Sequence, residues 1–330
     1  MRRIFKKKRS LSVLSIFVSA VAVLCAGFFI TMCGSGPQTS SKLVDRGAYA
    51  IDFSATSTPD MQLGFIDLSR SIQTMSSTPQ FTIEAWVMRK TTSTLAGGVF
   101  SRSISVDTDA DLVNDLSNGI ALIASAPGSL ANEPTFVEVV NNTEYLVRPG
   151  ATSTTFTNNQ WTHVAGVFTN QSHGTGVHSS CGSGTSTYHL DLYMNGTFVN
   201  CASATATPEF AYGERIGRLH TNFPGATFDM TDIATKLNAV IDEVRFWKVA
   251  RTGDQIQQCM GQEIGIGGTC GWTSDLIGYW PLNTGTGFTA SDSSGTSNTG
   301  TISYCVTGSG CDSGGTTTSW TGGWTAGYPF

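Results

Sequence analysis

The chain has 330 residues, of which 40% are hydrophobic and only 13% are charged, and its formal net charge is −5. All six charged residues before residue 33 are basic, so the remainder carries 13 Lys and Arg against 24 Asp and Glu, a net charge of about −11. Such an acidic chain excludes nucleic acid as an expected partner, because phosphate binding needs a basic surface. Free cations and neutral molecules such as sugars remain candidate ligands.

Residues 1–32 indicate an export signal. Six basic residues between Arg2 and Arg9 precede an uncharged, mostly apolar run of 22 residues from Leu11 to Met32, as in secretory signals. The run is long for a cleaved signal peptide and is about the length that spans a bilayer. A signal peptide and an uncleaved membrane anchor are therefore both open.

The stretch "FFITMCGSG" places Cys33 directly after the apolar run. It resembles the lipobox of bacterial lipoproteins, which implies that Cys33 becomes the lipidated first residue of a protein held in the cell envelope. Met32 departs from the pattern, because the lipobox has a small residue before the cysteine. The alternatives are the uncleaved anchor and soluble secretion. Residues 33–47 are predicted to be a flexible tether.

Many short segments follow in which apolar and polar residues alternate, and stretches of Gly, Ser and Thr separate them. This pattern predicts one large all-β domain. In "FTIEAWVMR" the residues Phe81, Ile83, Ala85 and Val87 share one face, as in a half-buried strand. The clearest predicted strands are residues 81–89, 161–168, 188–194 and 240–249.

Two local signals refine this pattern. Asn195-Gly196 follows "YHLDLYM" and predicts a hairpin, because both residues tolerate positive φ. "TGDQIQQCM" predicts one short helix over residues 252–260, because Thr252 and Gln255 have the spacing of a capping box.

Six cysteines follow Cys33 and form three couples that are local in sequence. An exported protein can oxidise them to disulfides, although six cysteines allow 15 pairings. The expected bridges are Cys181 with Cys201, Cys259 with Cys270, and Cys305 with Cys311.

The strand segments carry phrases in a characteristic order: "FTIEAWVMR", "WTHVAGVF", "LYMNGTFV", "IDEVRFWKVARTGDQIQQCM" and "LIGYWPLNTGTG". Together they resemble the laminin-G-like, concanavalin A-like jelly-roll domains of bacterial surface proteins. The resemblance implies a two-sheet antiparallel sandwich over residues 48–306, with one short helix near its C-terminal end. Residues 307–330 are rich in Gly, Ser and Thr and are expected to form a draped tail or an edge strand.

The same sandwich serves lectins, adhesion modules and glycoside hydrolases, so the fold does not fix a function. The hydrolases place carboxylates two residues apart along one strand face. Here Glu84 is followed by Trp86, while Asp242 and Glu243 are adjacent, which on a regular strand turns them to opposite faces. We expect Glu243 to pair with Arg245 or with solvent. The sequence thus favours a protein that is not an enzyme.

The favoured function is recognition of a carbohydrate or an extracellular protein, in the manner of a lectin or adhesin. The alternatives are a structural envelope protein without a ligand and, less favoured, a polysaccharide-acting enzyme. Five aromatic residues within the strand phrases are interpreted as core residues: Trp86, Trp161, Trp247, Tyr279 and Trp280. The ligand site is expected in the loops 102–118, 127–158, 170–186 and 218–236.

"DTDADLVNDLSN" has oxygen ligands at the spacing of an EF-hand-type calcium loop. The predicted Ca²⁺ ligands are Asp107, Asp109, Asp111, the carbonyl of Val113, Asp115 and Asn118. Two departures weaken the pattern, because Leu112 replaces the turn glycine and Asn118 replaces a bidentate glutamate. The alternatives for this loop are that it binds magnesium or that it binds no metal. The phrase "DSSGTSN" around Asp292 is an alternative cation loop.

Overall fold

Alternating apolar residues give the chain two antiparallel β-sheets that face each other. The structure is a computed structural model, and it describes residues 49–54, 56–58, 61–68, 80–90, 97–106, 115–125, 133–140, 143–149, 155–170, 181, 188–204, 214–218, 237–265, 270, 273–306, 310–313, 323–327 and 329. These residues belong to one compact unit, Gly47–Phe330, whereas no residue of the other unit, Met1–Arg46, is among them.

Sheet A is built on the strands that the sequence predicts most clearly. Its spatial order is β11 (Thr197–Ala204), β10 (Tyr188–Met194), β9 (Trp161–Thr169), β4 (Phe81–Arg89), β13 (Ala239–Trp247), β1 (Tyr49–Asp52) and β18 (Trp324–Ala326), with β14 (Leu276–Trp280) also paired to β13. Asn195 and Gly196 both have positive φ in the turn between β10 and β11. The predicted hairpin is therefore confirmed. Part of the predicted C-terminal segment forms β18, an edge strand of this sheet.

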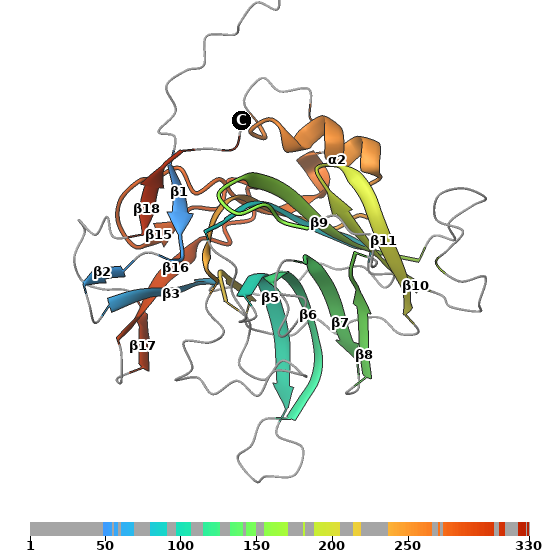
Figure 1. Cartoon of the computed structure of the whole chain (residues 1–330), viewed down its shortest axis with the longest axis horizontal. Helices are drawn as coiled ribbons and strands as arrows, with labels where there is room; N and C mark the ends of the chain where they lie inside the picture. The colour runs from blue at the N-terminus through green and yellow to red at the C-terminus, as the bar shows by residue number, and fades with distance from the viewer. Residues whose placement is uncertain are drawn as a thin grey trace, which may run out of the picture. The chain divides into compact units, whose positions relative to one another are not determined.

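Sheet B forms the second layer. Its spatial order is β15 (Thr289–Ala290), β16 (Gly300–Val306), β3 (Met61–Leu68), β12 (Glu214–Ile216), β5 (Gly97–Val106), β6 (Asp115–Ser125), β7 (Thr135–Val140) and β8 (Thr143–Val147), with β17 (Gly310–Ser313) beside β16 and β2 (Thr56–Thr58) beside β3. In Figure 1, β5 to β8 form a layer below β9, β10 and β11. The expected jelly-roll sandwich is confirmed.

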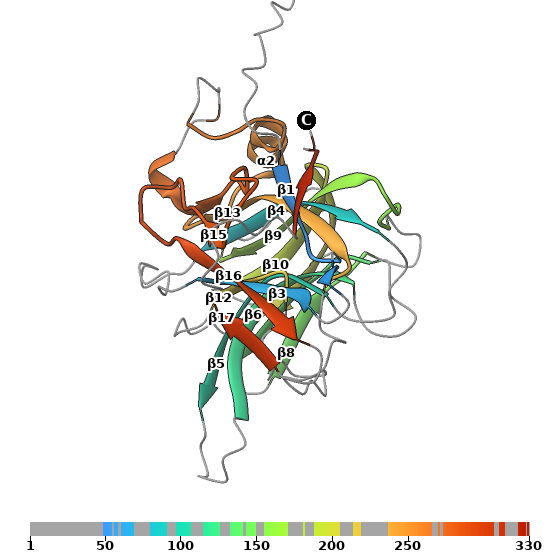
Figure 2. The same ribbon diagram turned by 90° about the vertical axis from the view of Figure 1, so that its left-hand side faces the viewer.

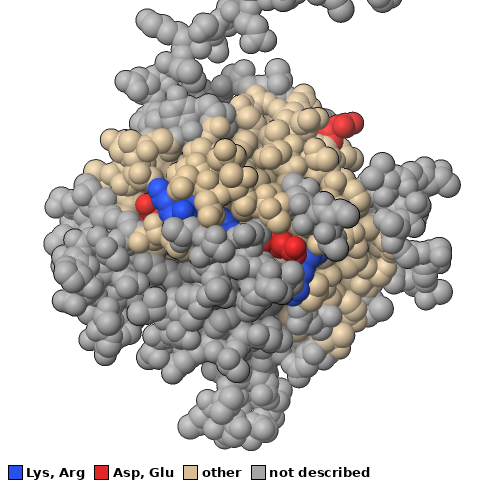
Figure 3. All heavy atoms as spheres, viewed as in Figure 1, with Lys and Arg blue, Asp and Glu red and all other residues tan. Residues whose placement is uncertain are grey.

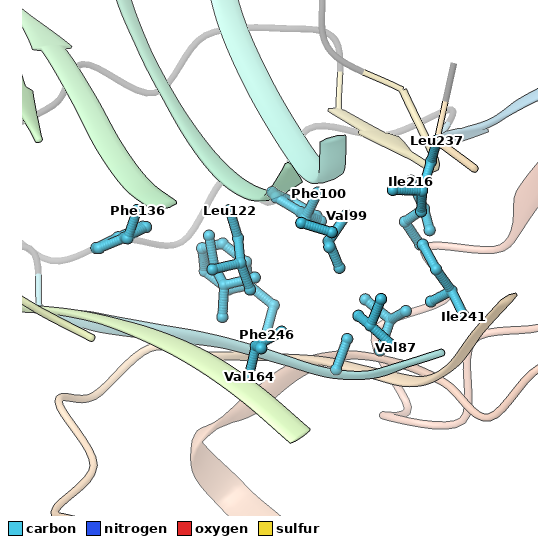
Figure 4. Packing of buried hydrophobic residues seen from close by; sticks show 14 of the residues in the cluster. Val87, Val99, Phe100, Leu122, Phe136, Val164, Ile216, Leu237, Ile241 and Phe246 are labelled. Atoms are coloured by element: carbon cyan, nitrogen blue, oxygen red, sulfur yellow. The ribbon is translucent and has the colours of Figure 1, made fainter. Parts of the chain in front are cut away.

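The main core lies between the two sheets. Figure 4 shows Phe100, Leu122 and Phe136 of sheet B pointing toward Val164 and Phe246 of sheet A. Phe81 stacks on Phe168 and on Phe246, with ring centroids 5.3 and 5.6 Å apart. The four residues of β4 that were predicted to share a face, from Phe81 to Val87, all belong to this cluster.

The short helix α2 (Gly253–Met260) covers the other face of sheet A (Figures 1 and 2). It begins at Thr252 with the predicted capping box: the side chains of Thr252 and Gln255 bond to each other's backbone N–H. Ile256 packs on Val167 and Tyr193, outside the main core. As a result β4 is buried on both faces, and the prediction of a half-buried strand is wrong because the helix covers the second face.

Candidate functional site

The outer face of sheet A holds a buried cluster of charged residues around Glu84. β4 supplies Glu84, β9 supplies His163, β13 supplies Arg245, and Arg251 comes from the segment before α2. The Glu84 carboxylate accepts hydrogen bonds from Trp247 Nε1 at 2.8 Å and Arg251 Nη1 at 3.0 Å. Arg245 Nη1 lies 3.6 Å and His163 Nε2 3.7 Å from its oxygens. All these side chains are at most 3% exposed.

The electrostatics of this cluster favour an ionised Glu84 and a neutral His163. Burial alone would raise the pKa of Glu84, but the charges of Arg251 and Arg245 hold it below its usual value. Burial lowers the pKa of His163 to about 4, against the opposing effect of Glu84. Burial also acts to lower the pKa of Arg245, but Glu243 and Glu84 outweigh it and raise that pKa. With His163 neutral, Glu84, Arg245 and Arg251 together carry one net positive charge at neutral pH.

A β-bulge in β13 brings Asp242 and Glu243 to the same face. Their neighbours Ile241 and Val244 both point into the main core, Glu243 has φ +54°, and the pairing with β4 shifts between Asp242 and Arg245. The prediction that the two carboxylates point to opposite faces is therefore wrong, because the bulge inserts one residue into the alternation.

The predicted pairing of Glu243 with Arg245 is confirmed. Arg245 Nη2 donates to Glu243 Oε2 at 2.6 Å, and the Tyr279 hydroxyl lies 2.9 Å from both oxygens of that carboxylate. Burial raises the pKa of Glu243 despite Arg245, and burial and Glu243 raise the pKa of Asp242. These carboxyl groups are therefore engaged with the protein.

Residues 251–265, here called the roof, cover this cluster and bond to it directly. Arg245 donates to the carbonyl oxygens of Cys259 at 2.9 Å and Gln262 at 2.6 Å. Trp86 Nε1 donates to the carbonyl of Met260 at 2.7 Å. The roof therefore closes the sheet face that carries these charged residues.

Most of the aromatic residues that were predicted to lie in the core are buried. Trp247 and Trp280 are fully buried, Tyr279 is 2% exposed and Trp86 is 9% exposed, while Trp161 is half-buried. The core interpretation is confirmed for the first four. Among the described residues, Tyr49 is the one large hydrophobic side chain that is exposed, at 37%. Few of the described side chains visible on the face shown in Figure 3 are charged.

The predicted calcium loop lies largely outside the described residues. Asp107, Asp109, Asp111 and Val113 belong to the part that is not described. Asp115 and Asn118 belong to the backbone of β6, opposite Val106 and Ile104 of β5. The loop thus joins two paired strands, and its metal binding stays a prediction.

The alternative cation loop at Asp292 is organised by protein donors. Its carboxylate accepts from the backbone N–H groups of Tyr279, Ser294 and Asn298 and from the hydroxyls of Ser294 and Thr296, at 2.8 to 3.0 Å. Although burial opposes it, these bonds lower the pKa of Asp292. The loop therefore needs no cation to satisfy this carboxylate.

Two of the three expected disulfides are present, Cys181–Cys201 and Cys259–Cys270, with Cα atoms 5.4 and 5.2 Å apart. The second joins the end of α2 to Cys270. The ladder of β16 and β17 places Cys305 opposite Cys311, and their bridge stays a prediction. Cys33 lies outside the described residues.

Sequence reasoning missed a polar row inside the sandwich. Glu214, Arg102, Ile120 and Glu138 are consecutive cross-strand partners, so they share the face on which Ile120 joins the main core. Arg102 Nε lies 3.3 Å from Glu214, whereas Glu138 has no hydrogen-bond partner for either oxygen within the described part of the chain. The sequence did carry a signal for this row, because charged residues occupy strand positions that the apolar–polar alternation assigns to the core.

Comparisons with known proteins agree with the fold. The sequence matches the profile of the family Laminin_G_3, described as the concanavalin A-like lectin/glucanases superfamily, over residues 64–257. No curated protein sequence matches the chain. Among the described residues no helix has the length and apolarity needed to cross a membrane.

Three solved structures illustrate the likeness. A candidate carbohydrate-binding protein from Bacteroides ovatus is 17% identical, with a TM-score of 0.48, over 80% of this chain and 61% of its own length. The CBM40 of a Ruminococcus gnavus IT-sialidase, bound to α2,3-sialyllactose, is 11% identical (TM-score 0.39; 64% and 97% covered). Domains LG4-5 of the mouse laminin α1 chain are 10% identical (TM-score 0.39; 63% and 44% covered). At these identities the likeness concerns the fold alone.

Proposed function

Because the chain belongs to the laminin G family of the concanavalin A-like lectin/glucanases superfamily, we propose that it is a non-enzymatic binding module. Its ligand is a glycan or an extracellular protein, and its site lies in the loops at the ends of the sheets. The superfamily includes both lectins and glucanases, so the family alone does not separate binding from catalysis.

The burial of the sheet-face carboxylates favours binding. A retaining or inverting glycosidase needs two carboxyl groups that flank the scissile bond of a substrate. Glu84, Asp242 and Glu243 are at most 2% exposed, and Glu84 and Glu243 are paired with arginines beneath the roof. They are enclosed by the protein and would need the roof removed before they could meet a polysaccharide.

The module is proposed to act outside the cell, tethered to the membrane. The basic and apolar segment 1–32 supports export, and Cys33 supports lipidation in the cell envelope. Mass spectrometry of the membrane fraction would test this, since a diacylated Cys33 at the N-terminus is the expected product. A protein in that fraction that still carries residues 1–32 would favour the uncleaved anchor instead.

Calcium is proposed to order the loop around Asp107, Asp109 and Asp111. A site with a Kd of about 1 mM, as in extracellular modules, would stabilise the protein by about 1 kcal/mol at about 5 mM Ca²⁺. The expected rise in Tm is about 2 to 4 °C for a domain of this size. Asp109→Asn should abolish the rise, whereas Asp254→Asn, at the exposed start of α2, should retain it. An unchanged Tm in wild type would end this part of the proposal.

A screen of the protein against glycans and matrix proteins, with and without calcium, tests the binding function. Saturable binding of a defined glycan or protein is the expected result. Absence of any ligand across the screen would favour a structural envelope protein. Release of sugars from a polysaccharide panel would instead favour an enzyme.

A further inference from the structure

Cys181, Cys201 and Asp191 form a group of potential metal ligands at the edge of sheet A. Their ligand atoms, the two sulfurs and a carboxylate oxygen, all lie within 4.8 Å of one another. Cys181 and Asp191 are 5% and 2% exposed. Two thiolates and a carboxylate are a ligand set that suits Zn²⁺, whereas the calcium proposed for the acidic loop takes oxygen ligands only.

We propose that these three residues form a zinc site when the Cys181–Cys201 disulfide is reduced. In the oxidised protein the two sulfurs are bonded to each other and provide no thiolate. The same side chains would then have two alternative states, a disulfide and a metal centre. This proposal is independent of the ligand-binding function.

Contacts other than the disulfide also hold the three residues near one another. Asp191 and Cys201 are direct partners in the ladder of β10 and β11, which lie side by side in Figure 1. They therefore share one face of the sheet. The Ser203 hydroxyl donates to the carbonyl of Cys181 at 2.7 Å, which holds Cys181 against β11. Reduction breaks the S–S bond and leaves these backbone and side-chain contacts in place.

The geometry requires only a small adjustment for zinc. Sulfurs bound to a tetrahedral Zn²⁺ lie about 3.8 Å apart, because each Zn–S bond is about 2.3 Å long. Rotation of the two cysteine side chains provides this separation, since the Cα atoms are 5.4 Å apart. Asp191 supplies the third ligand, and the fourth position is left for water, as in other sites with three protein ligands.

The redox step is balanced by a dithiol reductant. The disulfide accepts two electrons and two protons, giving the thiols of Cys181 and Cys201, and the dithiol becomes a cyclic disulfide. Zn²⁺ then displaces the two thiol protons, since thiolate is the form that binds metal. Zinc binding should therefore release two protons to the buffer for each chain.

Zinc titration of the oxidised and the reduced protein, in competition with a chromophoric chelator, tests the proposal. The protein is reduced with dithiothreitol and freed of it under argon. The reduced wild type is expected to bind one more zinc than Cys201→Ser does, and the oxidised protein none at this site. The double variant Cys259→Ser/Cys270→Ser, which lacks the other disulfide, should keep the full stoichiometry.

Asp191→Asn keeps both cysteines and decides the result if Cys201→Ser fails to fold. We expect it to weaken zinc binding by at least about tenfold, because a neutral amide replaces a charged ligand. Equal zinc binding by wild type, Cys201→Ser and Asp191→Asn would overturn the proposal. So would a reduced wild type that binds no zinc.

Discussion

Glu138→Gln should stabilise the protein, and the gain should grow as the pH rises. Glu138 points inward between Ile120 and Tyr145 on neighbouring strands, and neither of its oxygens has a hydrogen-bond partner among the described residues. Burial raises the pKa of this carboxyl from 4.5 to about 8. The folded protein therefore holds the carboxyl largely protonated at pH 7, whereas the unfolded chain ionises it.

The sign and size of the effect follow from this difference in pKa. A raised folded-state pKa gives a stabilisation that is complete below pH 4.5 and is lost as the pH rises through about 8. One pKa unit corresponds to about 1.4 kcal/mol, so the loss is about 3 kcal/mol at pH 7 and approaches about 5 kcal/mol above pH 8. Gln has nearly the same shape and does not ionise, so it should avoid the loss.

Urea unfolding at pH 5, 6, 7 and 8 measures the effect. The free energy of unfolding of Glu138→Gln minus that of wild type should grow by about 3 kcal/mol from pH 5 to pH 8. The matched control is Glu214→Gln in the same inward row, which leaves Arg102 without its ion pair. It should destabilise the protein by about 3 to 5 kcal/mol. Parallel curves for wild type and Glu138→Gln would refute the reasoning.

Three further substitutions test the packing and the polar contacts. Glu84→Gln should cost about 3 to 5 kcal/mol in thermal unfolding, because it removes the carboxylate that pairs with the buried Arg251. Asp292→Asn should cost about 2 kcal/mol or more at pH 7, and the difference from wild type should shrink as the pH falls below about 3.8, since the lowered pKa of Asp292 stabilises the fold only while the group is ionised. Gly166→Ala should lower the free energy of unfolding by about 1 to 3 kcal/mol, because a Cβ there would meet the Phe136 ring at 2.5 Å, whereas Gly261→Ala, with open space around it, should change it little.

The regular strands could be predicted because their signals are local. Alternation in "FTIEAWVMR" places β4 at Phe81–Arg89, and the Asn195-Gly196 turn fixes the end of β10. The capping box places the start of α2 within one residue. The two disulfides that are present join cysteines at most 20 residues apart, so their pairing was also accessible from the sequence.

The bulge and the buried charges could not be predicted, because they depend on distant segments. The shift at Glu243 shows itself only when β13 is paired with β4, and Glu243 finds its donors in Arg245 and Tyr279. Glu84 gives no local sign that an arginine 167 residues away lies at 3.0 Å. For the candidate ligand site, the sequence specifies loops rather than side-chain positions, and most of the Asp107–Asn118 stretch lies beyond what the structure describes.

The way the roof is attached also determines how it unfolds. A helix of eight residues has no stability of its own in water, so α2 persists only while it is docked on sheet A. Its docking uses directional bonds: Trp86 and Arg245 of the sheet donate to roof carbonyls, and Arg251 of the roof donates to Glu84. The roof cannot slide or open in small steps without breaking several of them. Backbone amides of α2 should therefore exchange with solvent in the same cooperative event as those of β4 and β13.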